Sequence, residues 1–167
     1  MFRKMDDFHK SYQTLTEGTL KIFKAVDADA MCRNVAEGHR TLRGMAWHIV
    51  TTIPEMMNQV GLGLSSVDEK TFPPGSPAEL TAGYETVSAE LIAALRAKWD
   101  DDDLVKTDDL YGESWARGLT LKILMDHEIH HRGQMTVLMR QAGLTVPGVF
   151  GPSKEEWAQF GMDLPPY

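Results

Sequence analysis

The chain has 167 residues and a formal net charge of -7, with 43% hydrophobic and 25% charged residues, which favours one globular domain over residues 1–167. The acidic balance argues against binding to nucleic acid or to anionic membranes, and no segment approaches the roughly 18 apolar residues that a membrane-spanning helix needs. The N-terminal residues turn acidic without a signal-peptide core, and the lone Cys32 excludes an intrachain disulfide, so we expect a cytoplasmic protein.

Two helices are predicted in the first third of the chain. Apolar residues recur at three- and four-residue steps over about residues 4–26, which is the spacing of one helix face. A second helix is expected over about residues 41–61, where Pro54 should cause a kink or an early stop. His48 lies on a face of this helix that mixes small, apolar and polar residues, which suits a wet pocket. Taken alone, however, His48 is better explained as a histidine hydrogen-bonded within a helical bundle.

The third helix has the clearest start signal. Ser76 can cap it, Pro77 suits its first position, and Glu79 completes a capping box. The apolar pattern continues to Trp99. The acidic run over residues 100–103 lacks the spacing and the distal glutamate of an EF-hand, so it is interpreted as a solvated helix terminus.

The fourth helix is expected over residues 116–142, after an irregular loop over residues 104–115, with Gly143 as its C-cap. It is apolar on two faces, which is typical of a central helix or of one shared with a second subunit, and we predict a homodimer. Ser153 and Glu156 fit a second capping box, which predicts a short helix in the tail. Strand signals are weak throughout. The predicted fold class is therefore all-α, a four-helix bundle with a C-terminal tail containing a short helix.

The fourth helix contains the run Asp126-His127-Glu128-Ile129-His130-His131-Arg132-Gly133-Gln134. Residues four apart share one helix face, so His127 and His131 can point at a common site. They lie in an apolar stripe, where each imidazole needs a partner, either a divalent metal ion or a backbone or carboxylate group. In a bundle, His48 can face the pair. Three neutral imidazoles would leave positions open on an ion, as in a catalytic site rather than a closed structural one.

The same run also partly matches two other kinds of metal site. His127 to His131 fits the His-Glu-x-x-His pattern of zinc proteases, in which Glu128 would be the general base. No third histidine follows at the metzincin spacing, and the chain offers no strand to hold a peptide. Glu128 and His131 also have the Glu-x-x-His spacing of di-iron bundles, but a second such motif is missing. On a helical wheel, Glu128 and His130 fall at the two edges of the metal-facing stripe, and His130 could line a pocket rim.

Several segments together are typical of one known family: His127-Glu128-Ile129-His130-His131-Arg132-Gly133-Gln134, Leu138-Met139-Arg140, Gly143, Trp47-His48-Ile49, and Phe150-Gly151-Pro152-Ser153 before Trp157. With them the sequence resembles the DinB/YfiT-like family of metal-dependent proteins, closest to the DinB branch, over nearly the whole chain. The resemblance implies a four-helix bundle, commonly dimeric, in which three histidines bind nickel, zinc or a similar ion. Transferred by position, the metal ligands are His48, His127 and His131.

The family also implies a range of functions. Some relatives are S-transferases or isomerases that use a low-molecular-weight thiol, and others have been described as hydrolases. We therefore expect an enzyme of the metal-dependent thiol S-transferase type with one nickel or zinc ion per chain, in which the ion lowers the pKa of the bound thiol. Thr52 and Glu55 are candidate pocket-lining residues. The alternatives are a hydrolase with a metal-activated water and a non-catalytic metal-binding stress-response protein.

Overall fold

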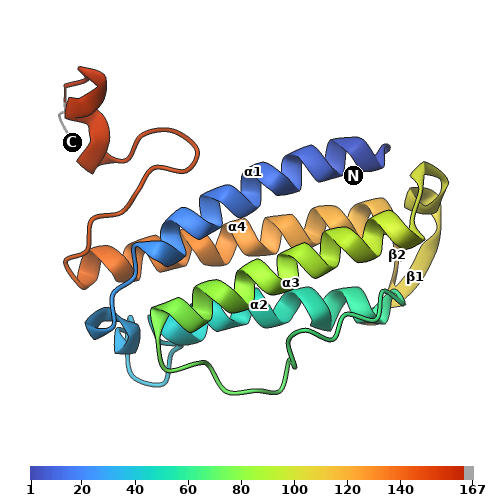
Figure 1. Ribbon diagram of the computed structural model, residues 1–167, viewed down its shortest axis with the longest axis horizontal. Coiled ribbons are helices and arrows are strands. Elements are labelled where there is room, and N and C mark those ends of the chain that lie inside the picture. The colour runs from blue at the N-terminus through green and yellow to red at the C-terminus, as the bar shows by residue number, and fades with distance from the viewer. Residues whose placement is uncertain (164–167) are drawn as a thin grey trace.

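The computed structural model describes residues 1–163, within which long helices dominate and lie side by side (Figure 1). These are α1 (Met5–Lys24), α2 (Leu42–Gln59), α3 (Pro77–Lys98) and α4 (Arg117–Gln141). Short 3-10 helices are η1 (Asp29–Cys32), η2 (Asp101–Val105) and η3 (Lys154–Phe160). None of the described helices is long and apolar enough to cross a membrane.

Each long helix packs against two others. The α2 helix contacts α3 and α4, and α1 also contacts α3 and α4. The apolar stripes predicted from three- and four-residue spacing meet in one buried core, to which every long helix contributes: Phe8, Tyr12, Ile22, Leu42, Ile53, Met57, Tyr84, Leu91, Leu121 and Met135. The core therefore holds α2 and α4 side by side, which positions the histidines on those two helices.

The boundaries of the helices follow local chemistry. The predicted capping box of α3 is present, since Ser76 Oγ accepts from Glu79 N at 3.2 Å while Glu79 Oε2 accepts from Ser76 N at 3.1 Å. Of the two outcomes expected at Pro54, a kink or an early stop, the early stop is wrong, because α2 continues to Gln59. Pro54 is buried among core residues of its own helix, and this packing offsets the hydrogen bond that proline cannot donate.

The expectation of an irregular loop over residues 104–115 is also wrong. Strands β1 (Thr107–Leu110) and β2 (Glu113–Ala116) form an antiparallel hairpin, so the fold is mostly helical with a small two-stranded sheet rather than strictly all-α. Tyr111 and Gly112 form its turn with φ values of 54° and 84°. Two positive φ values are typical of a type I′ turn, whose twist suits a two-residue hairpin. The strands themselves are too short and too acidic to give a strand signal in the sequence.

The hairpin is attached to α4 by ion pairs. Arg117 donates to Asp108 through Nε at 2.8 Å and to Asp103 through Nη1 at 3.0 Å. Asp103 also accepts from Lys106 at 2.7 Å. The acidic run that follows α3 is therefore a structured 3-10 turn that receives cations, rather than only a solvated helix end.

The tail follows α4 and turns back along α1. A Cβ atom on Gly18 would lie 2.4 Å from Cγ1 of Val149, which shows how closely the tail approaches this helix. The short helix predicted there is present as η3, with its Ser153–Glu156 capping box. Arg140 pairs with Glu155 at 3.2 Å, which attaches η3 to the end of α4. In Figure 1 the η3 segment projects beyond the long helices.

The apolar residues on the second face of α4 are already covered by the chain's own helices. Leu121 and Met139, two of these residues, are both 0% exposed. Ile129 and Met125 are half-buried. Burial within the chain thus accounts for Leu121 and Met139, and the homodimer stays a prediction.

Candidate metal centre

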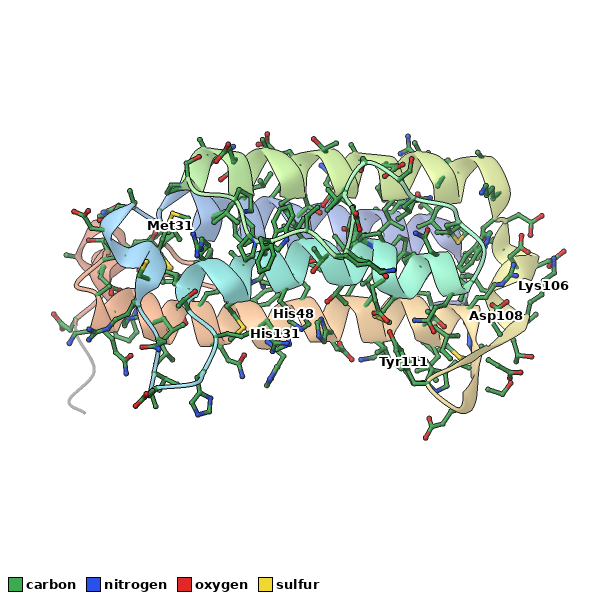
Figure 2. All side chains as sticks on the ribbon, turned by 90° about the horizontal axis from the view of Figure 1, so that it is seen from below. Met31, His48, Lys106, Asp108, Tyr111 and His131 are labelled. Atoms are coloured by element: carbon green, nitrogen blue, oxygen red, sulfur yellow. The ribbon has the colours of Figure 1, made fainter. Side chains whose placement is uncertain are left out.

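His48 of α2 and the pair His127 and His131 of α4 lie together on one side of the helices, and Figure 2 shows His48 and His131 next to each other. His127 Nε2 is 3.2 Å from His48 Nε2 and 3.1 Å from His131 Nε2. The three ring centroids are 4.4–4.9 Å apart, and the rings meet edge to face. The predicted convergence of these imidazoles is therefore present, while their role as ligands stays a prediction.

The spacing of the three nitrogens fits a single divalent ion. Nitrogen ligands at about 2.0–2.1 Å from such an ion lie about 2.8–3.0 Å apart at adjacent octahedral positions and about 3.3–3.4 Å apart in tetrahedral geometry. The two Nε2 separations of 3.1 and 3.2 Å fall between these values. Hydrogen bonds cannot satisfy all three ring nitrogens at once. Each nitrogen of a neutral imidazole carries either one N–H or one lone pair, so it can form one hydrogen bond and the third nitrogen is left without a partner. The donor set could hold a metal ion.

The electrostatics keep the histidines in the form that binds metal. Burial lowers the pKa of His48 to about 4, with the positive charge of Arg40 and the other two imidazoles adding to the effect. Burial and the neighbouring His131 lower the pKa of His127 to about 4. The pKa of His131 is also lowered, again chiefly by burial. All three rings are consequently neutral at pH 7, which leaves lone pairs free for coordination.

Gln134 orients one of these rings. Its Oε1 lies 2.7 Å from His131 Nδ1, and because a carbonyl oxygen can only accept, His131 carries its proton on Nδ1. This leaves the lone pair of His131 Nε2 facing the other two histidines. Gln134 Nε2 lies 3.1 Å from His130 Nε2, so one amide bridges both rings. His130, predicted at a pocket rim, is exposed and outside the three-histidine cluster.

Glu128 does not point toward the histidines, which corrects its predicted place at the edge of the metal-facing stripe. It is 2% exposed, and its Oε1 accepts from Thr19 and from Tyr84, both at 2.6 Å. These partners belong to α1 and α3, so the carboxyl faces the core of the molecule. Burial raises its pKa. A general base of the zinc-protease kind would have to face the ion, so this arrangement does not fit that site.

The two candidate pocket-lining residues are engaged elsewhere. Thr52 is buried and donates to His48 O at 2.7 Å, so it supports the helix turn that carries His48. Glu55 accepts from Tyr111 Oη at 2.7 Å and so connects α2 to the hairpin, whose Tyr111 lies on the same side of the molecule as the histidines (Figure 2). Neither residue lines the cavity that opens beside His131.

That cavity has a volume of about 580 Å³. Its walls come from the loop before α2, from α2 and from α4: Val35, Gly38, His39, Arg40, Met45, His131, Gln134, Val137 and Leu138. Sequence reasoning missed Arg40, because its loop carries no periodic signal and nothing local relates it to a histidine 91 residues later in the chain. Of the three clustered histidines, His131 lines this cavity.

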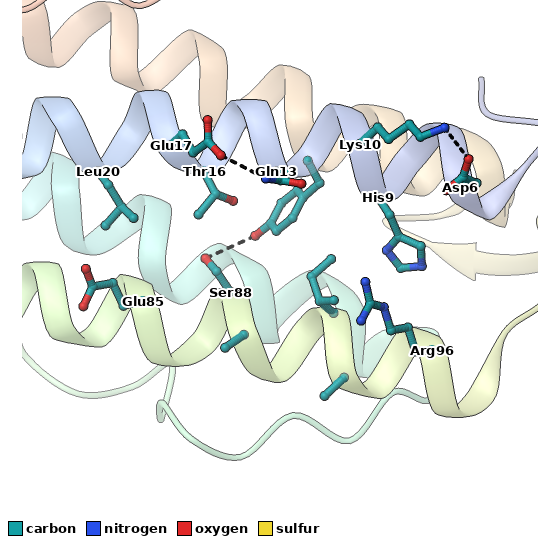
Figure 3. A pocket seen from close by; sticks show the side chains of 14 residues that line it. Asp6, His9, Lys10, Gln13, Thr16, Glu17, Leu20, Glu85, Ser88 and Arg96 are labelled. Carbon is teal, nitrogen blue, oxygen red and sulfur yellow. Dashed lines mark hydrogen bonds and ion pairs between the residues drawn. The ribbon is translucent and has the colours of Figure 1, made fainter.

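A larger groove of about 640 Å³ lies between α1 and α3 (Figure 3). It contains none of the three clustered histidines, and charges of both signs line it, among them Asp6, Glu85 and Arg96. Tyr12 and Ser88 are hydrogen-bonded across its floor at 3.3 Å. This groove belongs to the opposite pair of helices, so we assign the candidate site to the smaller cavity.

A profile of the DinB family matches residues 1–163. The chain belongs to the DinB family. The uncharacterized protein YrdA of Bacillus subtilis strain 168 is 36% identical over 165 residues, covering 99% of both chains. A crystal structure of a DinB-like protein from Bacillus cereus ATCC 10987 is 38% identical and covers 90% of this chain and 100% of its own, with a TM-score of 0.85.

A second DinB-like crystal structure, YjoA from Bacillus subtilis, extends the likeness to a more distant sequence. It is 21% identical and covers 86% of this chain and 97% of its own, with a TM-score of 0.68. At this identity the likeness concerns the fold alone. The helical arrangement that brings His48 to α4 is thus the DinB-like fold, whereas the chemistry must be argued from this chain's own residues.

Proposed function

We propose that this DinB-family chain holds one divalent transition-metal ion, nickel or zinc, through His48, His127 and His131. We propose further that it is a metal-dependent enzyme of the thiol S-transferase type, with its long helices forming the family's four-helix bundle. The observation that supports both statements best is the convergence of neutral Nε2 atoms at 3.1–3.2 Å beside a cavity.

A bound ion would supply Lewis acidity, which lowers the pKa of a thiol so that the thiolate persists near neutral pH. The chain's own residues determine where the ion would be held and from which side a thiol could reach it. The packing of α2 against α4 sets the spacing of the histidines, and Gln134 fixes the proton of His131 on the side away from the cluster. The cavity beside His131 then admits the thiol and its electrophile from one side.

An open site favours an enzyme over a closed metal-binding module. The tail is the segment that could have covered the histidines, but its described part lies elsewhere. Val149 approaches Gly18 of α1, and Phe150 lies over the Arg132 guanidinium at 4.9 Å. Among the described residues, none from the tail lines the cavity beside His131.

A screen of low-molecular-weight thiols, carried out with and without added metal, tests this function. The protein is purified without an affinity tag, its metal content is measured, and conjugation of monobromobimane to each common low-molecular-weight thiol is followed with and without nickel or zinc. We expect metal-dependent conjugation with at least one thiol. Hydrolysis of ester or amide substrates without any conjugation would instead support metal-activated water, and metal binding without either activity would support a non-catalytic role.

A further inference from the structure

The cavity beside His131 differs in charge from the rest of the protein. The chain carries a net charge of -7, yet no aspartate or glutamate lines this cavity. Its ionisable lining residues are Arg40, His39 and His131. A cavity that holds a guanidinium group and lacks carboxylates attracts anions, in contrast to the acidic balance of the chain as a whole.

Arg40 is available to bind such an anion. It is exposed, and among residues 1–163 no aspartate or glutamate forms an ion pair with its guanidinium. Arg40 lines the same cavity as His131. The planar guanidinium can donate two parallel hydrogen bonds to one carboxylate.

Apart from Gln134, the side chains of the remaining wall are apolar. Val35 and Val137 are 61% and 52% exposed, and Met45 and Leu138 lie beside them. Val137 is an exposed β-branched residue on α4, and packing within the chain does not require an apolar side chain at this position. An apolar wall next to a cation suits a ligand with a short hydrocarbon portion and an anionic end.

We propose that this cavity recognises a carboxylate on the thiol substrate, with Arg40 as the residue that determines this specificity. The carboxylate pairs with Arg40, the hydrocarbon portion contacts Met45 and Val137, and the thiol faces the histidine cluster. The proposal rests on the proposed function, because it names the class of thiol that the same site accepts.

Three thiols of matched length and different charge test this specificity. They are 3-mercaptopropionate, 3-mercaptopropan-1-ol and 3-aminopropane-1-thiol, each titrated into the cobalt-loaded protein while the thiolate-to-cobalt absorption is recorded. We expect the carboxylate to bind roughly five- to tenfold more tightly than the alcohol at low salt, as a charge-assisted hydrogen bond provides, and the amine to bind most weakly.

Variants identify the residue responsible. Arg40→Gln should bring the dissociation constant of 3-mercaptopropionate to that of the alcohol without changing cobalt content, and Arg40→Lys should keep part of the preference. Arg96→Gln is the matched control, because it removes the same charge from the groove between α1 and α3 (Figure 3) and should leave the preference intact. Equal affinities for the carboxylate and the alcohol in the natural protein, or a preference that survives in Arg40→Gln, would overturn the proposal.

A thiol-free pair separates this proposal from the proposed function. Binding of 3-phenylpropionate and of 3-phenylpropan-1-ol is measured by calorimetry on the metal-loaded protein and on Arg40→Gln. If no thiol gives an absorption band but 3-phenylpropionate binds in an Arg40-dependent manner, the thiol function fails and the anion site stands. If the thiols give bands without any preference for a carboxylate and 3-phenylpropionate does not bind, the specificity fails while the thiol function stands.

Discussion

His131 Nδ1 donates to Gln134 Oε1 at 2.7 Å, one helix turn further along α4. This bond sets the tautomer that presents Nε2 to the other two histidines, so its loss should weaken metal binding. We expect Gln134→Leu to lower metal affinity about 10- to 100-fold, the usual effect of removing a hydrogen-bond partner from a ligating histidine. Competition with a chromophoric chelator measures the dissociation constant. Gln134→Glu keeps the acceptor oxygen and should stay near the natural value, and equal losses in both variants would contradict this role.

His48 comes from a different helix than the other two histidines, so its removal tests the convergence itself. We expect His48→Ala to reduce bound metal from one ion per chain to a small fraction, because two imidazoles on α4 do not complete the site. Elemental analysis after dialysis gives the stoichiometry. His130→Ala is the matched control, since His130 neighbours His131 in sequence but lies outside the three-histidine cluster. A control that loses as much metal as His48→Ala would assign the effect to α4 rather than to the site.

Glu128 is a buried carboxyl whose pKa is raised, chiefly by burial. A raised pKa means that the folded state binds a proton more tightly than the unfolded state. The associated stabilisation is complete below the unfolded pKa of about 4.3 and is lost as the pH rises through the raised folded value. We therefore expect Glu128→Gln to gain stability relative to the natural protein as the pH increases from 4 to 8, measured by urea unfolding at each pH.

Glu128→Ala provides the contrast for the same position. It leaves the buried hydroxyls of Thr19 and Tyr84 without their acceptor, which should reduce the free energy of unfolding by about 2–4 kcal/mol at pH 7. Both Glu128 variants should retain metal when folded, because the carboxyl faces α1 and α3. A folded Glu128→Gln that no longer binds metal would place this residue in the site after all.

Tyr111 has a φ of 54° in the turn of the hairpin, a conformation that β-branched residues rarely adopt. Tyr111→Val and Tyr111→Asn both remove the hydrogen bond to Glu55, but asparagine tolerates the left-handed conformation and valine does not. We expect Tyr111→Val to be less stable than Tyr111→Asn by about 1–2 kcal/mol. Chemical unfolding of the pair measures this difference, and equal stabilities would contradict the turn geometry.

The tail approaches α1 closely at Gly18. An added Cβ would lie 2.4 Å from Val149 Cγ1 and 3.0 Å from Arg132 Nη1, so Gly18→Ala should displace the tail and increase its cleavage by proteases. Gly133→Ala is the matched control on α4, because a Cβ there meets nothing within 4 Å and should instead add about 0.5–1 kcal/mol of helix stability. Equal protease resistance of the natural protein and Gly18→Ala would show that the tail is not held by this contact.

The histidine cluster could be predicted from the sequence because two of its members are four apart on one helix. The third, His48, required the additional assumption of a bundle, and the DinB resemblance supplied the same position. Ser76 and Glu79 fixed the start of α3 for a similarly local reason. The His127–His131 pair and the Ser76–Glu79 capping box each depend on residues within about one helix turn of each other.

Apart from the local hairpin, the features that the sequence did not reveal depend on contacts between distant segments. Glu128 shares its helix with the histidines, yet its orientation follows from Thr19 and Tyr84, which donate to it from α1 and α3. The hairpin depends on a two-residue turn and on the pairing of Arg117 with Asp108. Arg40 reaches the site only through the path of its loop. Helix periodicity carries no information about any of these.

The spacing of His48 and His127, 79 residues apart along the chain, also bears on how the protein matures. A polypeptide emerging from the ribosome presents His48 early, but the other two imidazoles follow only after more than three quarters of the chain has been made. Any ion held by all three is therefore acquired late in synthesis or after release, and once captured it ties the first half of the polypeptide to the second.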